Sequence, residues 1–381
     1  MLRFLDAGES HGKMILAIID GIPSNFDVDI DFINSELKRR QYGYGRGERM
    51  NFEDDKIEII TGLRGDKTTG NPITLAVYNK DYENWKHILE VKAGPEDRIT
   101  VPRPGHGDMV GYFKYGTGDI RDVIERTSAR ETTIRTAVGA MCKLILKSIG
   151  IEVRSVVHSI GNFHEEEIDL FDDNIYEKIE KSPVRCYNEE MSKNFMKKID
   201  ICKEQGETIG GSVKISVKGV PLGIGSYTQW DRKLDAILSY AIMSLQGVKA
   251  IEFGNGLDLS RRGSNFNDEI YYDGNNIKRY SNNSGGIEAG VSNGENIEAK
   301  VFIKPIPSVK KDLRTIDLRK RKNTETRYER SDVCAVVPAS IVLENIVAFE
   351  ILKEILNKFP ADEFYELKRS INFYRETVYL R

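Results

Sequence analysis

The sequence predicts an α+β protein or a layered β-α-β arrangement rather than a doubly wound parallel sheet. Three observations support this prediction. Apolar residues recur at helical spacing in three long segments, they alternate with polar residues in two shorter ones, and the two kinds of segment follow no strict βαβ order. The chain has 381 residues, 40% of them hydrophobic, which is enough to bury a large core as one big domain or two ordinary ones.

Three segments are expected to be amphipathic helices. Residues 129–148 form the first, because their apolar residues recur every three or four positions and Gly150 follows as a stop signal. Residues 234–248 repeat this pattern as a second helix. Residues 340–359 repeat it as a third helix, which Pro360 ends.

Two shorter segments are expected to be strands. Residues 211–220 alternate apolar residues such as Val213 and Ile215 with polar ones, which is the period of a half-buried strand. Residues 299–303 alternate less cleanly. The charged, glycine-poor stretch at about residues 165–198 is expected to be a peripheral helical excursion rather than a domain boundary.

Charge and composition narrow the classes of function. The chain carries 56 basic and 59 acidic residues, a formal net charge of -3, so neither nucleic acid nor a membrane is expected as a partner. Its four cysteines form no CxxC pair, which is typical of reduced thiols in a cytoplasmic protein. The longest apolar run near the N-terminus, residues 14–19, is too short for a signal peptide or a membrane span.

Several of the 33 glycines cluster with arginine and other polar residues. The clusters begin at Gly8 (GESHGK), Arg39 (RRQYGYGRGERM), Arg103 (RPGHGD), Lys114 (KYGTGD) and Asn282 (NNSGGIEAGVSNG). Glycine lets the backbone approach a ligand closely, and arginine forms paired hydrogen bonds with carboxylate and phosphate oxygens. The pattern therefore predicts a local site for a small polyanion.

Other interpretations of these clusters stay open from the residues alone. Segment 39–50, with its arginines, glycines and tyrosines, is also typical of RNA-binding segments, so a nucleic-acid- or nucleotide-binding protein is the alternative function, and a solvated loop is another. The GESHGK segment is one residue short of a phosphate-binding P-loop and lacks its final Ser or Thr. No metal site is expected, because the sequence has no HExxH or CxxC cluster.

Two of the five histidines, His11 and His106, stand in glycine-flanked turns. Such turns are where rigid scaffolds often present functional side chains. A protonated imidazole beside a leaving phosphate would offset negative charge and protonate the departing oxygen. A turn-stabilising role is the alternative for both histidines.

Taken together and in order, the motifs resemble those of chorismate synthases over about residues 1–360. The matching segments begin at Gly8 (GESHG), Gly21 (GIPS), Arg39 (RRQYGYGRGERM), Thr68 (TTGNPI), Pro102 (PRPGHGD), Glu125 (ERTSARET), Gly225 (GSYTQWDRKLD), Met243 (MSLQGVKAIEFG), Asn282 (NNSGGIEAG), Lys304 (KPIPS) and Glu329 (ERSDVCAV).

The resemblance implies a single large domain over residues 1–381 with a layered β-α-β sandwich core, an excursion at about 165–198 and a C-terminal extension at about 361–381. It implies a carbon–oxygen lyase that converts 5-enolpyruvylshikimate 3-phosphate to chorismate by anti-1,4-elimination of phosphate, the last common step of aromatic amino acid biosynthesis in the shikimate pathway. It also implies a requirement for reduced FMN, with NADPH as an indirect reductant, and a homotetramer.

Carried over residue by residue, the resemblance implies three catalytic side chains. His11 is expected to donate a proton near the leaving phosphate, His106 to lie near the pyrimidine side of the flavin, and Asp332 to assist hydrogen removal near the reactive flavin nitrogen. Substrate-binding residues are implied at Ser10, Ser128, Arg40, Arg46, Arg49, Arg103 and Arg130, and two of these, Arg40 and Arg46, also match positions associated with NADP. FMN-binding residues are implied at Arg126, Thr127, Ser128, Gln246, Gly247, Ala289, Lys304, Pro305, Ile306, Pro307, Ser308 and Arg330.

The chain departs from the family's pattern at five positions. Gly107 and Gly247 stand where alanine is usual, Thr127 where a small Ala or Ser is usual, and Asn267 where many members have His. Ala289 replaces a glycine, which puts a backbone of positive φ there in doubt.

Structural alternatives also exist for parts of the implied site. Arg126 and Arg130 are four residues apart and could form a solvated helix face, paired with Glu125 and Glu131. Asp332 could cap the apolar helix that follows it. A flavoprotein that binds its cofactor without catalysis is a further alternative function.

Overall fold

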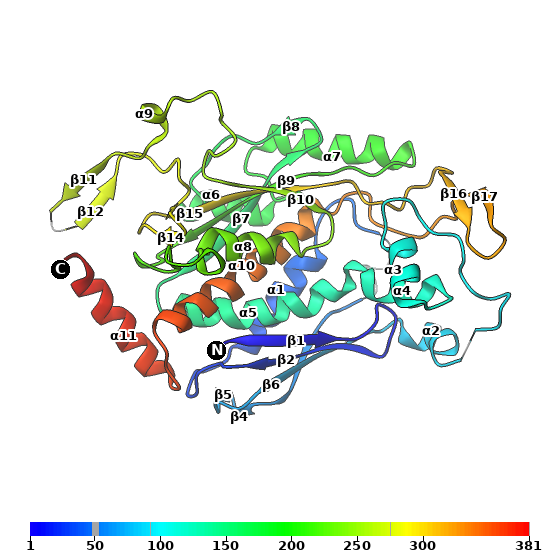
Figure 1. Ribbon diagram of the computed structural model, residues 1–381, viewed down its shortest axis with the longest axis horizontal. Coiled ribbons are helices and arrows are strands. Elements are labelled where there is room, and N and C mark those ends of the chain that lie inside the picture. Colours follow the sequence, from blue (N-terminus) through cyan, green and yellow to red (C-terminus); the bar gives the residue numbers. More distant parts are fainter. Residues whose placement is uncertain (48–52, 92, 275, 381) are drawn as a thin grey trace.

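The computed structural model describes residues 1–47, 53–91, 93–274 and 276–380. It is a layered β-α-β sandwich, which confirms the predicted fold class: two antiparallel sheets enclose a layer of long helices (Figure 1). The sheet that is lower in Figure 1 has the strand order β1-β2-β6-β3, and the upper sheet has the order β10-β15-β9-β7-β8.

The strands of the two main sheets come from both halves of the chain. The lower sheet contains β1 (Arg3–Ala7), β2 (Met14–Asp20), β3 (Ile57–Thr61) and β6 (Ile73–Tyr78). The upper sheet contains β7 (Glu152–Ile160), β8 (Phe163–His164), β9 (Gly211–Lys218), β10 (Val248–Phe253) and β15 (Ile297–Ile303). Short two-stranded pairs are formed by β4 (Leu63–Arg64) with β5 (Lys67–Thr68), β11 (Ile270–Asp273) with β12 (Asn276–Arg279), β13 (Ile287–Glu288) with β14 (Val291–Ser292), and β16 (Arg314–Asp317) with β17 (Lys322–Glu325).

The helices divide into a central layer and a periphery. The central layer holds α1 (Ile30–Gln41), α5 (Thr132–Ser148), α8 (Leu234–Met243) and α10 (Val336–Lys358). The peripheral helices are α2 (Tyr82–Leu89), α3 (Asp108–Tyr115), α4 (Ile120–Thr127), α6 (Asp173–Lys181), α7 (Glu189–Glu204), α9 (Gly263–Phe266) and α11 (Phe364–Thr377). None of the described helices is long and apolar enough to cross a membrane.

Helix α10 is the centre of the core. Nearly all of its residues are buried, because it packs on α5 along one side and on β7 and β9 along another. Gly139 of α5 makes this packing close: a Cβ atom there would lie only 2.2 Å from the backbone oxygen of Asn345. A side chain at Gly139 would therefore push the two helices apart.

The three predicted helices exist, with different ends. The first begins with a short 3-10 turn, Ala129–Glu131, before α5. The second was predicted to reach residue 248, which is wrong: α8 ends at Met243, because Gly247 turns the chain with φ 89 and β10 then begins. The third starts at Val336, ahead of the predicted residue 340, since Pro338 lies in the first turn, where its missing N–H removes no helical hydrogen bond.

Strand β9 was predicted to be half-buried, and this is wrong because both of its faces are covered. Its polar residue Lys214 is buried and pairs with Glu167 and Glu298. Glu167 belongs to the charged stretch 165–198, which holds α6 and the first part of α7. Ion pairing therefore lets a lysine occupy a covered position on this sheet.

Residues 364–380 form α11 and a terminal 3-10 turn, Val378–Leu380, at the C-terminal end marked in Figure 1. Phe364, Leu367 and Ile371 are buried on one side of α11. Polar contacts hold its end, because Tyr374 donates to the Leu222 carbonyl (2.9 Å) and Arg375 donates to the Ile149 carbonyl (2.7 Å). This segment is thus packed against the sandwich.

Candidate active site

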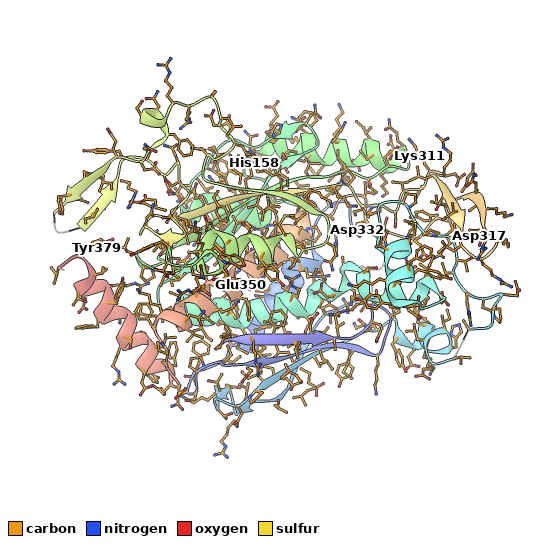
Figure 2. The ribbon with its side chains drawn as sticks, viewed as in Figure 1. His158, Lys311, Asp317, Asp332, Glu350 and Tyr379 are labelled. Carbon is orange, nitrogen blue, oxygen red and sulfur yellow. The ribbon has the colours of Figure 1, made fainter. Side chains whose placement is uncertain are left out.

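The predicted catalytic residues are carried by loops that precede or join regular elements. His11 lies between β1 and β2, His106 lies just before α3, and Asp332 lies ahead of α10. Helices α2, α3 and α4 gather at the right of Figure 1, and Figure 2 places Asp332 on that side of the centre.

A buried carboxylate and an indole ring hold His11. Its backbone N–H donates to Glu125 Oε2 (2.8 Å), its Nδ1 lies 3.0 Å from Glu125 Oε1, and its ring stacks on Trp85. Burial alone would raise the pKa of Glu125, but hydrogen bonds and charge from His11 outweigh burial and lower that pKa. Glu125 thus stays ionised at neutral pH and directs Nδ1 toward itself, which turns Nε2 away from this carboxylate.

The hydroxyl groups predicted to contact the substrate lie together beside His11. Ser10 is buried, and its hydroxyl donates to Ser128 Oγ (3.1 Å). Ser128 Oγ in turn accepts the backbone N–H of Arg130 (3.3 Å). The structure therefore brings Ser10, Ser128 and Arg130 into one contact chain.

Arg40 and Arg130 are buried around a common carboxylate. Arg130 Nη1 donates to Asp55 (2.8 Å), and Arg40 Nη1 lies 3.7 Å from the same side chain. Among the described atoms, Arg40 Nη1 and Arg130 Nη2 are buried without a hydrogen-bond partner. Burial lowers the pKa of Arg40 to about 9; Asp55 opposes this shift, while the charges of Arg46 and Arg130 add to it. Buried guanidinium nitrogen atoms that lack a hydrogen-bond partner are donors that an anionic ligand could use.

The solvated-face alternative for the end of α4 is wrong for Arg130, whereas Arg126 is exposed as that alternative expects and differs only in its partner. Arg130 is only 4% exposed and pairs with Asp55 rather than with Glu125 or Glu131. Arg126 pairs with Asp6 (2.7 Å). The neighbouring Thr127 hydroxyl donates to the backbone oxygen of residue 123 in its own helix (2.7 Å).

The arginines at 39 and 40 point inward, which removes support for a nucleic-acid-binding segment there. Arg39 forms ion pairs with Glu36, Glu180 and Glu344, and Arg40 is 5% exposed. Neither guanidinium is available to a phosphate backbone outside the protein.

Asp332 is held by the glycine-rich loop after α1. Its Oδ2 lies 2.5 Å from Arg46 Nη1, and its Oδ1 accepts the backbone N–H of Gly47 (2.7 Å). These contacts, and not the capping of α10, engage its side chain, because α10 begins after Ala335 without a side-chain cap. Arg46 Nε is buried without a hydrogen-bond partner among the described atoms. Arg49, a further predicted substrate contact, lies outside the described residues.

Like His11, His106 has its Nδ1 beside a buried carboxylate, which here is Asp108. Its Nδ1 lies 2.5 Å from Asp108 Oδ1, and Asp108 also accepts from Arg103 Nε (2.8 Å). Burial would raise the pKa of Asp108, but hydrogen bonds from His106 and Arg103 hold that pKa well below its usual range. Arg103 Nη1 donates to Ser308 Oγ (3.0 Å), so Arg103 ties the His106 loop to the predicted FMN-binding run.

The predicted FMN-binding run, residues 304–308, packs against the His106 loop. Lys304 Nζ donates to the Gly105 carbonyl (2.7 Å), and Ser308 O accepts from Ser331 Oγ (2.9 Å), the neighbour of Asp332. Between them, Ile306 O accepts the Thr208 hydroxyl (2.6 Å) and is flanked by Pro305 and Pro307. Burial, and then the charge of Lys249, lowers the pKa of Lys304. Two neighbouring lysines are suited to a phosphate group.

The remaining predicted FMN-binding residues are more dispersed. Gly247 O accepts the backbone N–H of Lys304 (2.9 Å), and Gln246 donates to Glu131 (3.0 Å). Arg330 is exposed. Ala289 lies in the β13–β14 turn, and Figure 1 shows β14 far from α3, the helix that follows His106.

Two departures from the family's pattern meet in space. A Cβ atom on Gly107 would lie 2.8 Å from Thr127 Cγ2, closer than real Cβ contacts. The larger side chain at Thr127 thus requires the smaller residue at Gly107, although φ of -72 at Gly107 would suit alanine.

Gly107→Ala is expected to lower the free energy of unfolding by about 1–3 kcal/mol, the usual cost of overpacking. The double variant Gly107→Ala/Thr127→Ala should regain most of the lost stability, because the clashing methyl group is removed. Urea unfolding of the wild type, both single variants and the double variant measures the coupling. Additive effects of the two substitutions would contradict a steric pair.

The sequence put a positive φ at residue 289 in doubt, because alanine stands there instead of glycine. The structure shows a positive φ of 51 at Ala289. Tertiary contacts impose it, because the next residue, Gly290, accepts the backbone N–H of Leu234 (2.9 Å) and β13 pairs with β14. The other variant position in this region, Asn267, ends α9. Its neighbour Asp268 holds the glycine-rich loop through the N–H of Asn283 (2.7 Å).

Ala289→Gly is expected to raise the free energy of unfolding by about 0.5–1 kcal/mol, since left-handed backbone costs alanine more than glycine. Ala236→Gly, on the exposed side of α8, is the matched control and should lower it by about 1 kcal/mol. Thermal and urea unfolding measure whether each substitution raises or lowers the free energy of unfolding. A lower free energy of unfolding in both variants would show that Ala289 is not strained.

Sequence reasoning missed the groups that orient the two histidines. Asp108 stands two residues after His106 in the quoted motif, so its spacing could have marked it, whereas Glu125, Trp85 and Arg121 had no such signal. Arg121 Nη1 lies 3.5 Å from Glu125 Oε1. Arg327 was also missed: burial lowers its pKa, Glu329 opposes this, and the charges of Arg121 and Arg103 lower it further.

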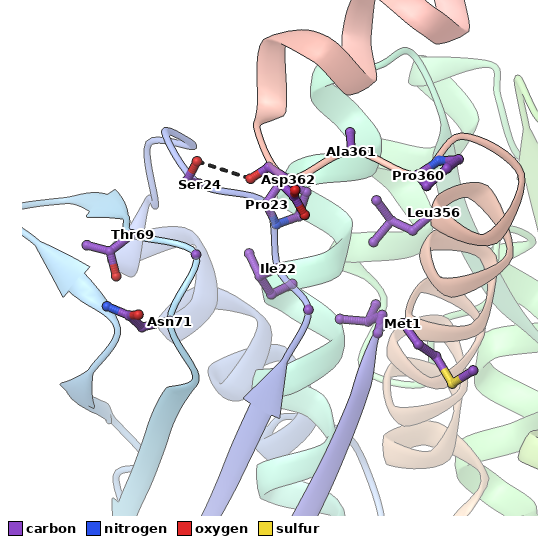
Figure 3. Close-up of a pocket in the computed structure, with 13 residues that line it drawn as sticks. Met1, Ile22, Pro23, Ser24, Thr69, Asn71, Leu356, Pro360, Ala361 and Asp362 are labelled. Atoms are coloured by element: carbon purple, nitrogen blue, oxygen red, sulfur yellow. Dashed lines mark hydrogen bonds between the residues drawn. The ribbon is translucent and has the colours of Figure 1, made fainter.

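A cleft of about 410 Å³ lies elsewhere, between the turn after β2, the loop after β5 and the α10–α11 connection (Figure 3). Its lining includes Ile22, Asn71 and Leu356, and Ser24 donates to the Asp362 carbonyl across one side (3.1 Å). None of the predicted site residues lines it. In the described part of the chain, no three His, Cys, Asp or Glu side chains are grouped to hold a metal ion.

Comparisons with known proteins agree with the motifs and the fold. The family model described as chorismate synthase matches residues 2–356. The chain is 73% identical to the chorismate synthase of Clostridium tetani, over 100% of this chain and 99% of that protein, and 50% identical to that of Alkaliphilus oremlandii over the full length of both. A solved structure titled "Crystal Structure of Chorismate Synthase" superimposes with a TM-score of 0.79 at 35% identity, covering 100% of this chain and 99% of the other. The chain belongs to the chorismate synthase family.

Proposed function

We propose that the protein converts 5-enolpyruvylshikimate 3-phosphate to chorismate and phosphate by anti-1,4-elimination, with reduced FMN as cofactor. The observation that carries this proposal is the pairing of two acid–base histidines with a group of buried arginines. His11 and His106 each turn Nδ1 to a buried carboxylate, and three arginines, Arg40, Arg46 and Arg130, each have a buried nitrogen atom without a hydrogen-bond partner among the described atoms. This combination suits a reaction in which a phosphate leaves.

The arginines provide the anion site of this proposal. The substrate has one phosphate and two carboxylates, and Arg40 Nη1, Arg46 Nε and Arg130 Nη2 are the buried donors that can bind them. Ser10 and Ser128 supply hydroxyl groups at the same place. Binding an anion would also relieve the mutual repulsion of these cations, which favours the occupied state.

The proton transfers are assigned to the catalytic residues predicted from the sequence. His11 donates its proton from Nε2 to the departing phosphate oxygen, while Glu125 holds Nδ1. His106, held by Asp108, would contact the bound flavin and help to set its protonation. Asp332 accepts a proton at the end of the reaction, and its pairing with Arg46 keeps the carboxylate positioned for this step.

The residues also fit FMN. Lys304 and Lys249 place two positive charges near each other, which suits the cofactor phosphate, and the glycine at residue 105 allows close backbone approach. Bound reduced flavin supplies electron density to the substrate ring as phosphate leaves, which a base alone cannot do because the lost hydrogen is not acidic. NADPH as an indirect reductant, a cytoplasmic location and a homotetramer belong to the same proposal.

The test is an anaerobic assay with dithionite-reduced FMN and 5-enolpyruvylshikimate 3-phosphate, in which chorismate absorbance and phosphate release are followed together. Equal appearance of both products, absent with oxidised FMN, is expected. A folded protein that binds FMN and forms no chorismate would overturn the proposal in favour of a binding-only flavoprotein.

A further inference from the structure

Trp85 lies face to face with His11, and the chain holds its indole ring in place. The two ring centroids are 4.1 Å apart at an interplanar angle of 30°. The indole Nε1 donates to the buried carboxylate of Asp81 (3.1 Å), and the Arg121 guanidinium lies 5.0 Å from the ring centroid. The indole therefore has a hydrogen bond at its edge and a cation at its face, which together restrict its rotation.

Trp85, Arg121 and Glu125 contact one another in sequence, and Trp85 and Glu125 both contact His11. Arg121, which lies over the indole, also approaches Glu125 Oε1 (3.5 Å), and Glu125 binds His11. The segment that carries Trp85 also holds the backbone of the histidine turn, because Asn79 Nδ2 donates to the Gly12 carbonyl (2.6 Å). One short segment, residues 79–85, thus contacts both the backbone and the ring of this turn.

A flat partner adds a restraint that the Glu125 contact does not provide, because that contact holds the ring at Nδ1. The second side-chain torsion of histidine is broad, and a ring stacked on the imidazole limits rotation about it. We propose that Trp85 is a positioning residue for His11: its anchored indole fixes the plane of the imidazole and so the direction of Nε2. This inference rests on the proposed function, in which Nε2 donates the proton.

The first experiment detects the stack without measuring activity. The chain has two tryptophans, and Trp230 is 75% exposed, so Trp230→Phe leaves Trp85 as the only indole fluorophore. In this background His11→Ala is expected to change the emission intensity of Trp85, because a stacked imidazole quenches indole fluorescence. The control His164→Ala removes an exposed histidine of β8 and should leave the emission unchanged. Identical emission with and without His11 would overturn the inference.

The second experiment separates positioning from folding. Trp85→Leu is expected to lower kcat between about tenfold and 100-fold with little change in KM, the scale of a misplaced reacting group. Trp85→Phe keeps a flat ring and should retain kcat within about threefold of the wild type. Wild-type kcat in Trp85→Leu, or equal losses in both variants together with a lowered melting temperature, would overturn the inference. Absence of turnover in the wild type would instead refute the proposed function, and the fluorescence result would still decide whether the stack exists.

Discussion

His106→Ala is expected to lower turnover by about two orders of magnitude or more, the usual scale for a lost acid–base group. Removal of the imidazole should leave its loop in place, because Asp108 still accepts hydrogen bonds from the backbone N–H (3.0 Å) and Nε (2.8 Å) of Arg103. Arg103 also keeps its bond to Ser308, so FMN binding is expected to persist. Anaerobic turnover and FMN titration of the same preparation measure both quantities.

The control for this prediction is His164→Ala. His164 is exposed on β8 at the edge of the upper sheet and takes no part in the loops around His11 or Asp332. Its removal should leave turnover unchanged. Near-wild-type turnover of His106→Ala with intact FMN binding would contradict a catalytic role, and a joint loss of turnover and FMN affinity would assign His106 to binding alone.

The positions of long helices could be predicted because burial leaves a periodic trace in the sequence. Residues 340–359 and 129–148 carry that trace, and α10 and α5 do form the centre of the core. The ends of the helices depend on single residues with local effects, such as Pro338 at the start of α10 and Gly247 after α8. This is why the predicted boundaries were displaced.

The contacts of the site were less accessible to sequence reasoning. The motifs identified the histidines, yet Glu125 is 114 residues from His11, and no spacing rule connects them. The arginines were predicted as ligands of an anion, and the structure adds that Arg40 and Arg130 share Asp55, which only the tertiary fold brings between them. The positive φ of Ala289 is likewise imposed by distant contacts against the local preference of alanine.

Glu344→Gln is expected to lower the free energy of unfolding by about 3–5 kcal/mol, the cost of removing one partner from a buried ion-pair network. The Glu344 carboxylate is fully buried and accepts hydrogen bonds from Arg39 (2.9 Å), Lys143 (2.8 Å) and Arg185 (3.0 Å). Burial would raise its pKa, but these three cations hold the pKa well below its usual range. A neutral amide would leave the cations undercompensated. Urea unfolding at neutral pH measures the loss.

The pH dependence of this loss follows from the lowered pKa. Because the folded-state pKa lies below that of the unfolded chain, about 4.3 for glutamate, the stabilisation by Glu344 is complete above the unfolded value. It declines as the pH falls through the folded-state value. The difference in unfolding free energy between wild type and Glu344→Gln should therefore be constant from about pH 6 upward and shrink in acid.

Glu354→Gln on the same helix is the matched control. Burial raises the pKa of Glu354, and its carboxylate accepts a hydrogen bond from the neutral amide of Asn357 (2.9 Å), so loss of its charge should cost less than about 1 kcal/mol. Equal effects of the two substitutions would mean that the network contributes nothing beyond an ordinary buried polar group. A large loss of unfolding free energy in Glu344→Gln alone would instead show that this network stabilises the support of the site. Glu344 binds Arg39 at the end of α1, and Arg40 and the Arg46 loop follow from there.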